Sequence, residues 1–409
     1  MRFAALALLL FVQSKDEVRA VIVVNKADWP KLKDVIERYE ADVAKKRGVK
    51  FDVISEDWKS PVEIREALKK AYETSKIEGA ILVGKLPFMR YHTTDHADAY
   101  DDKDGAIGVC PMYYEDLDGT FATPKSGLLE AGDCKQGAHR GAEIWVSWIY
   151  PRESLDEVKK FFDKTHRYYA GELKYNGRVL LWQTLDVEPA NADIKELKKV
   201  FTPDEIDHYA KDEPTIDQAT GLKVLPRTDL AKVGTLTKEN CPVPVWKYHG
   251  PNNPLVKQLY GLSSNFYDLY EVHYGGGYFH AYLLTEHVKV QGGSPKIVCM
   301  NACRTGQFDY KPERSIALAY IFDTQGTLAA MGPTVEASWS QLYNLVYRFM
   351  AEGDTLGRAW MRKDGLSELD ETDVAPNAKT GKTTYHDHTI PAHGSCLLGD
   401  PFVTMRERR

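Results

Sequence analysis

The chain has 409 residues, of which 43% are hydrophobic, 27% charged and 11% aromatic, a composition that excludes a disordered, collagen-like or fibrous protein. At roughly 100 to 200 residues per domain, this length allows two or three domains or one large α/β unit. Lys and Arg total 53 against 59 Asp and Glu, which gives a net charge of −6. The chain therefore has no excess of positive charge to neutralise the phosphates of a nucleic acid. We therefore expect no nucleic-acid partner.

The first 14 residues have the pattern of a signal peptide. Arg2 is followed by an apolar run from Phe3 to Val12 and then by a polar break. That run is too short to cross a bilayer, which takes about 20 residues, but it suits a signal-peptide core. Cleavage after Ser14 would give a chain that is secreted or held in the cell envelope or periplasm, without stable membrane insertion. A buried N-terminal strand or helix is the alternative.

The next residues alternate between short apolar runs and amphipathic stretches. We predict strands at 20–24, 51–54 and 80–83, separated by helices. The second helix has an N-cap signal in Ser60, Pro61 and Glu63. Strands that alternate with helices indicate a parallel sheet with right-handed crossovers.

The rest of the chain extends this α/β pattern. Residues 91–140 lose periodicity and indicate a long surface excursion, and residues 186–262 indicate substrate-facing or irregular connections. Strands are predicted at 143–149, 178–182, 266–272, 297–300 and 327–331, and helices at 155–169, 315–322 and around 342–349. We expect a first α/β subdomain over residues 18–172, on the substrate-cleft side, and a catalytic α/β subdomain over residues 177–405.

Two late strands end in reactive side chains. One ends at His273, before three glycines from Gly275, and the other leads to Cys303. In a parallel sheet the reactive residues lie outside the carboxyl ends of the strands. A thiolate beside an imidazole is the minimum for nucleophilic thiol catalysis, and glycine backbone could form an oxyanion site. The alternatives are a small buried cysteine, as expected for Cys299, and a simple glycine turn.

An ordered set of motifs resembles the gingipain-type cysteine peptidases of the caspase-like clan. The early motifs are IREALKKAYE, AILVGKLPFM, YYEDLDG and EIWVSWIYPRESLDEVKKFFD, and the late ones are NACRTGQF, SIALA, GTLAAMGPT, the Ser338-Trp339 pair and LLGDPF. The resemblance spans nearly the whole chain after the leader. It implies a caspase/gingipain-like α/β fold of mainly parallel sheets flanked by helices, in two adjacent subdomains.

The resemblance also implies roles for individual residues. Cys303 would be the nucleophile and His273 the general acid and base, and the backbone N–H groups of Cys303, Tyr274 and Gly275 would hold the oxyanion. No cofactor would be required for the chemistry, the partner would be a protein or peptide substrate, and structural calcium would be compatible with the family.

Three departures from the family pattern bear on activity. The family usually has His-Gly where this chain has His273-Tyr274, so His249, which precedes Gly250, is a fallback. Members directed to Arg or Lys have an acidic residue where this chain has Cys110-Pro111, so a pocket for basic side chains is not expected. Lys85 stands where an acidic residue is frequent. These departures leave room for a catalytically inactive relative.

Two further clusters could bind metals. Five aspartates lie between Asp95 and Asp104, and Asp116 and Asp118 precede Gly119, a density of oxygen ligands that suits calcium but lacks EF-hand spacing. His386, His388 and His393 could hold zinc, although surface positions are the simpler reading. The metal ligands, if any, stay unknown.

The leading hypothesis is therefore a secreted cysteine endopeptidase that forms an acyl-enzyme through Cys303 and His273. The alternative is a catalytically inactive gingipain-like binding or secretion-accessory module. A metal-dependent hydrolase that uses the late histidine cluster is a third reading.

Overall fold

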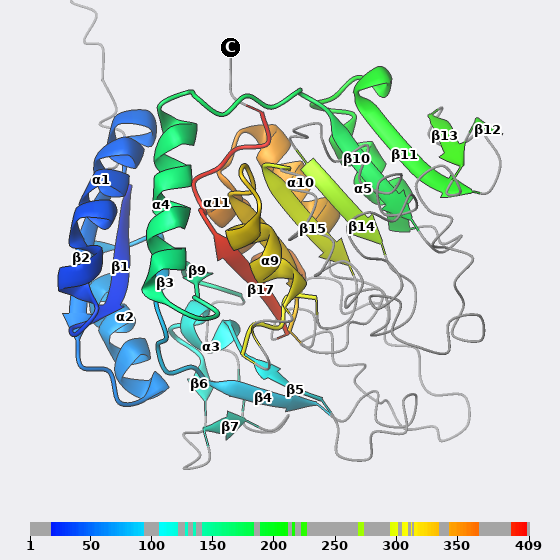
Figure 1. The fold of residues 1–409 in the computed structure, drawn as a ribbon. Helices are drawn as coiled ribbons and strands as arrows, with labels where there is room; N and C mark the ends of the chain where they lie inside the picture. Colours follow the sequence, from blue (N-terminus) through cyan, green and yellow to red (C-terminus); the bar gives the residue numbers. More distant parts are fainter. Residues whose placement is uncertain are drawn as a thin grey trace, which may run out of the picture.

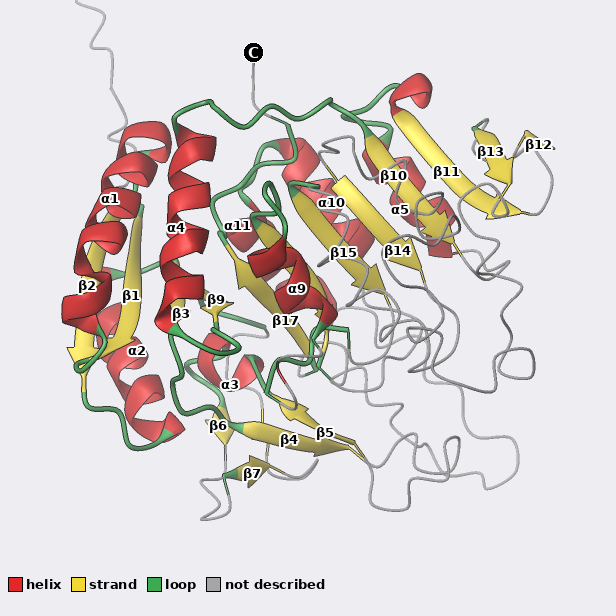
Figure 2. Ribbon diagram, viewed as in Figure 1, coloured by secondary structure: helices red, strands yellow, loops and turns green. Residues whose placement is uncertain are grey.

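The computed structural model describes fifteen stretches of the chain, and the fold is reported for these. They are residues 18–93, 106–121, 127–129, 134–135, 141–183, 189–211, 215–216, 222–226, 269–273, 295–301, 305–309, 312, 315–334, 343–367 and 394–406. Most of them build one large sheet with helices on both faces (Figure 1, Figure 2).

The main sheet has 12 strands in the order β12-β13-β11-β10-β14-β15-β16-β17-β9-β3-β1-β2. All neighbours are parallel except the β16/β17 and β12/β13 pairs. The strands are β1 (Arg19–Asn25), β2 (Lys50–Glu56), β3 (Gly79–Val83), β9 (Trp145–Ile149), β10 (Val179–Gln183), β11 (Ile206–Lys211), β12 (Thr215–Ile216), β13 (Lys223–Pro226), β14 (Leu269–His273), β15 (Ile297–Asn301), β16 (Ala329–Pro333) and β17 (Ser395–Gly399).

Helices cover both faces of the sheet, as a parallel sheet requires. The α-helices are α1 (Trp29–Arg47), α2 (Pro61–Ser75), α3 (Met112–Glu115), α4 (Leu155–Tyr169), α5 (Pro189–Leu197), α9 (Ile316–Asp323), α10 (Tyr343–Glu352) and α11 (Leu356–Ser367). Helix α4 packs between α1 and α9, whereas α10 packs between α5 and α11 on the opposite face (Figure 1). Every residue of β3, β9, β16 and β17 is consequently buried.

Local sequence signals explain several helix ends. The Ser60 hydroxyl caps α2 by accepting a hydrogen bond from the Glu63 N–H at 3.3 Å. The Glu63 carboxylate reaches one residue further back than a capping box does, and accepts from the Lys59 N–H at 2.8 Å. Helix α4 spans the predicted residues 155–169.

The prediction of a surface excursion over residues 91–140 is wrong for much of that segment. Strands β4 (Arg90–Thr93), β5 (Ala106–Val109) and β7 (Leu128–Leu129) form a second sheet in the order β5-β4-β7, and β6 (Thr120–Phe121) pairs with β8 (Cys134–Lys135). Val109, Tyr113 and Tyr114 are fully buried. Backbone carbonyl groups in this segment can be buried because the Arg65 guanidinium donates hydrogen bonds to them. It bonds the carbonyl groups of Tyr113 and Gly119, both at 2.8 Å.

The prediction of irregular connections over residues 186–262 also needs correction. Helix α5 and strands β11, β12 and β13 fall in this segment, and the strands extend the main sheet. Ile194, Leu197 and Phe201 are buried beneath them. A few apolar residues at helical spacing thus form the buried face of a helix, although the segment as a whole has a polar composition.

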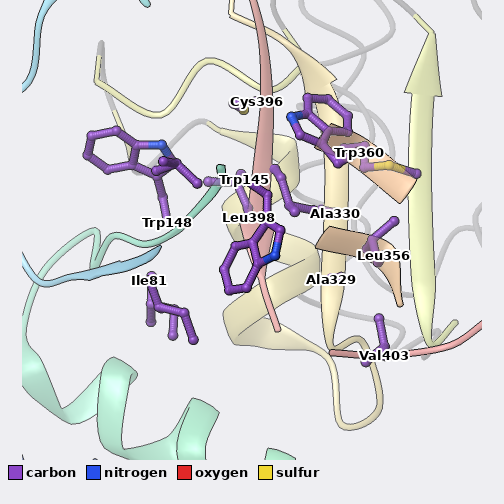
Figure 3. Close-up of a cluster of buried hydrophobic side chains, with 14 of the residues drawn as sticks. Ile81, Trp145, Trp148, Ala329, Ala330, Leu356, Trp360, Cys396, Leu398 and Val403 are labelled. Atoms are coloured by element: carbon purple, nitrogen blue, oxygen red, sulfur yellow. The ribbon is translucent and has the colours of Figure 1, made fainter. Parts of the chain in front are cut away.

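The core is richest in aromatic side chains around β9, β17 and α11. Trp145, Trp148 and Trp360 are each no more than 1% exposed and surround Leu398 and Cys396 (Figure 3). Core packing is therefore the role of the two β9 tryptophans. Tertiary burial of this size is a main source of stability in an α/β protein.

Strand β17 joins the two halves of the sheet. It lies antiparallel to β16 and parallel to β9. Residues 395–399 therefore lie between a strand from the first half of the chain and a strand from the second half. Asp400, which follows it, is fully buried and accepts hydrogen bonds from the Tyr39 and Tyr169 hydroxyls, both at 2.8 Å. The division of the chain at residues 172–177 stays a prediction.

Among the helices in the described ranges, none combines the length and the apolar character needed to cross a bilayer.

Candidate active site

The strand that carries His273 lies beside the strand that leads to Cys303. Strands β14 and β15 are parallel neighbours, and the register pairs His273 with Asn301. Cys303 follows Asn301 by two residues in the sequence. The two strands are therefore neighbours, and their carboxyl ends lie at one edge of the sheet. Cys303, Tyr274 and Gly275 lie outside the described residues, so their predicted roles stay predictions.

The backbone just after Cys303 packs directly against the end of β16. The Gly306 N–H donates to the Pro333 carbonyl at 2.7 Å. A β-carbon on Gly306 would lie 2.2 Å from the carbonyl oxygen of Gly332, closer than real β-carbon contacts come. Only glycine allows this approach, so position 306 fixes the course of the chain that leaves the candidate nucleophile.

Cys396 closes the same contact from β17. Its thiol is fully buried and donates to the Gly306 carbonyl at 3.2 Å and to the Gly332 carbonyl at 3.5 Å. Burial, with the negative charges of Glu115 and Asp309, raises the pKa of the Cys396 thiol. Cys396 is consequently a structural thiol rather than a nucleophile.

Residues 307–309 anchor the second sheet to this region. The Gln307 amide donates to the Ile107 carbonyl at 3.1 Å, and Arg90 Nε lies 3.2 Å from Asp309 Oδ2. Thr334, at the end of β16, donates its hydroxyl hydrogen to the Val109 carbonyl at 2.8 Å. Strands β4 and β5 are thereby held beside the segment that follows Cys303.

An aromatic cluster lies beneath this anchor. The Phe308 ring is buried, with its centroid 5.3 Å from that of Trp148, 5.2 Å from that of Tyr150 and 6.1 Å from that of Phe88. Aromatic contacts of this kind restrict side-chain motion. Residues 305–309 are thus packed against the aromatic core on their inner side.

The position expected to discriminate basic side chains carries no charge. Cys110 is fully buried, and its backbone N–H donates to the Met89 carbonyl at 3.0 Å. Pro111 follows it and is the N-cap residue of the short helix α3. Lys85, the other departure, is exposed after β3 and donates to the Arg152 carbonyl at 3.2 Å.

One acidic group within the described residues has the density of a cation site. Ligand oxygens of Asp116, Asp118 and Glu143 all lie within 4.8 Å of one another. Burial, reinforced by the charge of Glu143, raises the pKa of Asp116 to about 7. The Arg65 guanidinium lies behind the same turn and donates to the Asp116 carbonyl at 2.8 Å.

Other residues singled out from the sequence fall outside the described ranges. They are the fallback His249, the aspartates between Asp95 and Asp104, and the histidines His386, His388 and His393. Sequence reasoning in turn missed the Arg90–Asp309 pair and the role of Cys396. Neither carries a periodic signal, because each pairing joins segments that are far apart in the chain.

Comparisons with known proteins agree with this architecture. The model of peptidase family C25 matches residues 13–406. A solved structure described as "Structure of Protease" is similar, with a TM-score of 0.58 and 13% identity over 95% of this chain and 78% of that one. The crystal structure of the Arg-specific cysteine proteinase gingipain R has a TM-score of 0.56 and 16% identity over 97% of this chain and 80% of that one.

A search of curated protein sequences gave no match. The two structural matches are below the identity at which function transfers, and establish the fold. The family match covers almost the whole chain and establishes descent. The chain belongs to peptidase family C25, the gingipain family, and is a cysteine peptidase.

Proposed function

We propose that the protein is an exported cysteine endopeptidase in which Cys303 is the nucleophile and His273 the general acid and base. The observation that carries this proposal is the register of β14 and β15, which sets His273 level with Asn301, two residues before Cys303. A thiol and an imidazole contributed from these two strand ends would approach a peptide from one edge of the sheet.

The reaction follows from this pair of groups. His273 takes the proton of the Cys303 thiol, and the thiolate attacks the scissile carbonyl carbon to form a tetrahedral oxyanion held by backbone N–H groups around Tyr274 and Gly275. The C–N bond then breaks and His273 gives its proton to the leaving amine. Water, deprotonated by His273, hydrolyses the thioester and restores the free thiol.

The burial of Cys299 and Cys396 supports Cys303 as the nucleophile in preference to either of them. Cys299 lies inside β15 and Cys396 inside β17, and both are fully buried. Burial raises the pKa of Cys396, which disfavours its thiolate. By contrast, Cys303 follows a strand end at the edge where parallel-sheet enzymes assemble their sites.

The uncharged Cys110-Pro111 pair supports a preference away from basic side chains at the residue before the scissile bond. A carboxylate is the group that would pair with Arg or Lys there, and neither residue supplies one. We expect substrates with Arg at this position to be cleaved no faster than matched substrates with Gln.

Export of the chain is part of the proposal and rests on the leader-like first 14 residues. Amino-terminal sequencing of protein recovered from the medium or the cell envelope tests it. A start at Lys15 is expected, and an unprocessed Met1 in a cytoplasmic fraction would contradict export.

Intact-mass labelling tests the dyad directly. A panel of peptidyl acyloxymethyl ketones that differ in the residue before the reactive group should add one label to the wild-type protein. The label should disappear in Cys303→Ala and in His273→Ala, and persist in His249→Ala and Cys396→Ser. Labelling that survives Cys303→Ala would refute the assignment.

The alternative is a catalytically inactive member that retains the fold for binding or secretion. The observation that favours it is Tyr274, which follows His273 where the family usually has glycine. A folded, processed protein that no probe labels, but that binds peptides with Cys303 present or replaced, would support this alternative.

A further inference from the structure

One exposed arginine beside the candidate site is held in place while its outer face stays open. The Arg90 side chain is 46% exposed, whereas the carboxylate that it contacts, Asp309, is 3% exposed. The contact uses Arg90 Nε, at 3.2 Å from Asp309 Oδ2. Within the described ranges no hydrogen bond is found for the two terminal nitrogens of the Arg90 guanidinium, which leaves them available to a ligand.

The guanidinium also rests on a fixed aromatic surface. The Arg90 Cζ atom lies 5.4 Å from the centroid of the Phe88 ring. Phe88 in turn makes edge-on contacts with Trp148 and Phe308, with centroid separations of 6.5 and 6.1 Å. Stacking and the buried ion pair together limit the rotamers of Arg90, so little side-chain entropy remains to be lost on binding.

The site adjoins the segment that carries the candidate nucleophile. Asp309, whose carboxylate contacts Arg90, follows Cys303 by six residues in the sequence, a span of at most about 22 Å in any conformation. Gln307, in the same stretch, bonds the Ile107 carbonyl of β5 at 3.1 Å. An extended peptide bound for cleavage at Cys303 can therefore reach Arg90 within several residues of the scissile bond.

Among the arginines that the structure describes, no other exposed one shares this arrangement. Arg348 is the nearest match, since it is 48% exposed, pairs through Nε with Glu352 at 3.5 Å and lies over the Phe349 ring. Its carboxylate partner is 44% exposed and can move with it, whereas that of Arg90 is buried. Arg90 is thus distinguished by a partner that cannot turn outward.

We propose that Arg90 binds an acidic side chain of the peptide substrate, so that the peptidase prefers peptides with Glu or Asp near the scissile bond. The planar guanidinium offers two parallel N–H donors to a substrate carboxylate. A substrate amide side chain carries no charge, so it cannot form the same charge-assisted pair. This inference rests on the proposed peptidase function and names the substrate class for that site.

The charge of Asp309 determines what kind of preference results. Because Asp309 offsets the positive charge of Arg90, and the chain has a net charge of −6, long-range attraction of acidic peptides is weak. Discrimination comes from short, directional hydrogen bonds. It should therefore appear at one substrate position and fall only modestly with added salt.

Matched peptide pairs provide the test. Fluorogenic peptides that differ by Glu against Gln, or Asp against Asn, at each position around the scissile bond are compared by kcat/KM in the full-length protein. At one position the wild type should favour the acid by about 10-fold, as expected for a charge-assisted hydrogen bond. The ratio should fall to about 1 in Arg90→Gln.

Three further variants control for structural effects. Arg348→Gln should keep the wild-type ratio, because it removes a similar ion pair from α10, and Arg90→Lys should retain part of the preference. Arg90→Gln removes the Arg90 charge from beside the buried Asp309 carboxylate, so the double variant Arg90→Gln with Asp309→Asn separates loss of recognition from loss of fold. Equal acid-to-amide ratios in the wild type and Arg90→Gln would overturn the proposal.

A binding measurement separates this inference from the proposed chemistry. In Cys303→Ala, fluorescence anisotropy of the acidic and amide peptides should show the same ratio in Kd, and Arg90→Gln should remove it. Binding with this preference but no cleavage by the wild type would refute the peptidase mechanism alone. Cleavage with no preference and no effect of Arg90→Gln would refute the role of Arg90 alone.

Discussion

Gly306 and Gly332 touch through their backbones, so that a β-carbon on Gly306 would lie 2.2 Å from the Gly332 carbonyl oxygen. The first glycine follows Cys303 by three residues and the second lies in β16. The turn that leaves the candidate nucleophile is therefore set by the neighbouring strand. Cys396, in β17, also contacts this turn, with its thiol 3.2 Å from the Gly306 carbonyl oxygen.

Gly306→Ala tests this contact. The added methyl group must displace backbone, so we expect a loss of about 1 to 3 kcal/mol in the free energy of unfolding and a drop in probe labelling at Cys303 of at least about 10-fold. Gly48→Ala is the control, because Gly48 has a φ of 72° and open space around its α-carbon. It should lose about 1 kcal/mol and label normally. Normal labelling of Gly306→Ala would show that this contact does not position Cys303.

The buried Asp400 carboxylate ties α1 and α4 to the end of β17. Its oxygens accept from Tyr39 and Tyr169, so Asp400→Asn should lower the free energy of unfolding by about 2 to 4 kcal/mol, and Tyr39→Phe by about 1 kcal/mol. Urea unfolding measures both. Tyr72→Phe, on the partly buried side of α2, should change stability by less than about 0.5 kcal/mol. Equal losses for Tyr39→Phe and Tyr72→Phe would refute the role of the hydrogen bond.

Lys164 should make stability depend on pH. Its ammonium group is buried in α4 and donates to the Thr324 carbonyl at 3.2 Å, beyond the end of α9. Burial lowers the pKa of Lys164 to about 7, against an opposing effect of Asp323. In the unfolded chain the pKa returns to about 10.4. The unfolded state then binds more protons between pH 7 and about 10, so stability rises with pH in that window.

Urea unfolding between pH 6 and pH 10 measures this effect. The difference in free energy of unfolding, wild type minus Lys164→Met, should increase by up to about 1.4 kcal/mol per pH unit above pH 7. Below pH 7 this difference should be constant. Lys160→Met, which changes an exposed lysine on the same helix, should leave the profile unchanged. Parallel profiles for the wild type and Lys164→Met would mean that this lysine stays charged in the folded protein.

The cluster of Asp116, Asp118 and Glu143 gives the calcium hypothesis a specific test. If calcium binds there, a concentration 100 times the Kd should add about 2.7 kcal/mol to stability, and a chelator should remove it. Asp118→Asn should abolish the response, because it removes one of the three carboxylates of the cluster. Asp118 is exposed, so the substitution should not disturb the core. Asp156→Asn, an exposed substitution on α4, should keep it. A calcium response that Asp118→Asn leaves intact would place the ion elsewhere.

Elements with strong local signals were predictable from the sequence. Helix α4 was predicted because Val158, Phe161 and Phe162 recur at helical spacing and are indeed buried. Strand β16 begins two residues later than predicted, at Ala329. The reason is a turn in which the Thr327 N–H bonds the Thr324 hydroxyl, so a β-branched residue serves a loop.

Elements and sites that depend on distant partners were not predictable. The polar segment around Tyr113 is buried because Arg65 satisfies its carbonyl groups, and nothing local to that segment indicates an arginine 48 positions away. The neighbouring strands of His273 and Cys303 were predictable because parallel strands share an edge. The Arg90–Asp309 pair joins β4 to the segment between β15 and α9, and the periodicity of neither part gives a signal for it.

The place of β17 has a consequence for how the protein is made. Until residues 395–399 have left the ribosome, β9 and β16 have no strand between them, and two incomplete sheets expose open edges. The same strand supplies Cys396, which holds the turn after Cys303. A chain shortened before residue 395 would therefore lack an assembled turn after Cys303, and proteolytic competence would depend on a strand far beyond the nucleophile in the sequence.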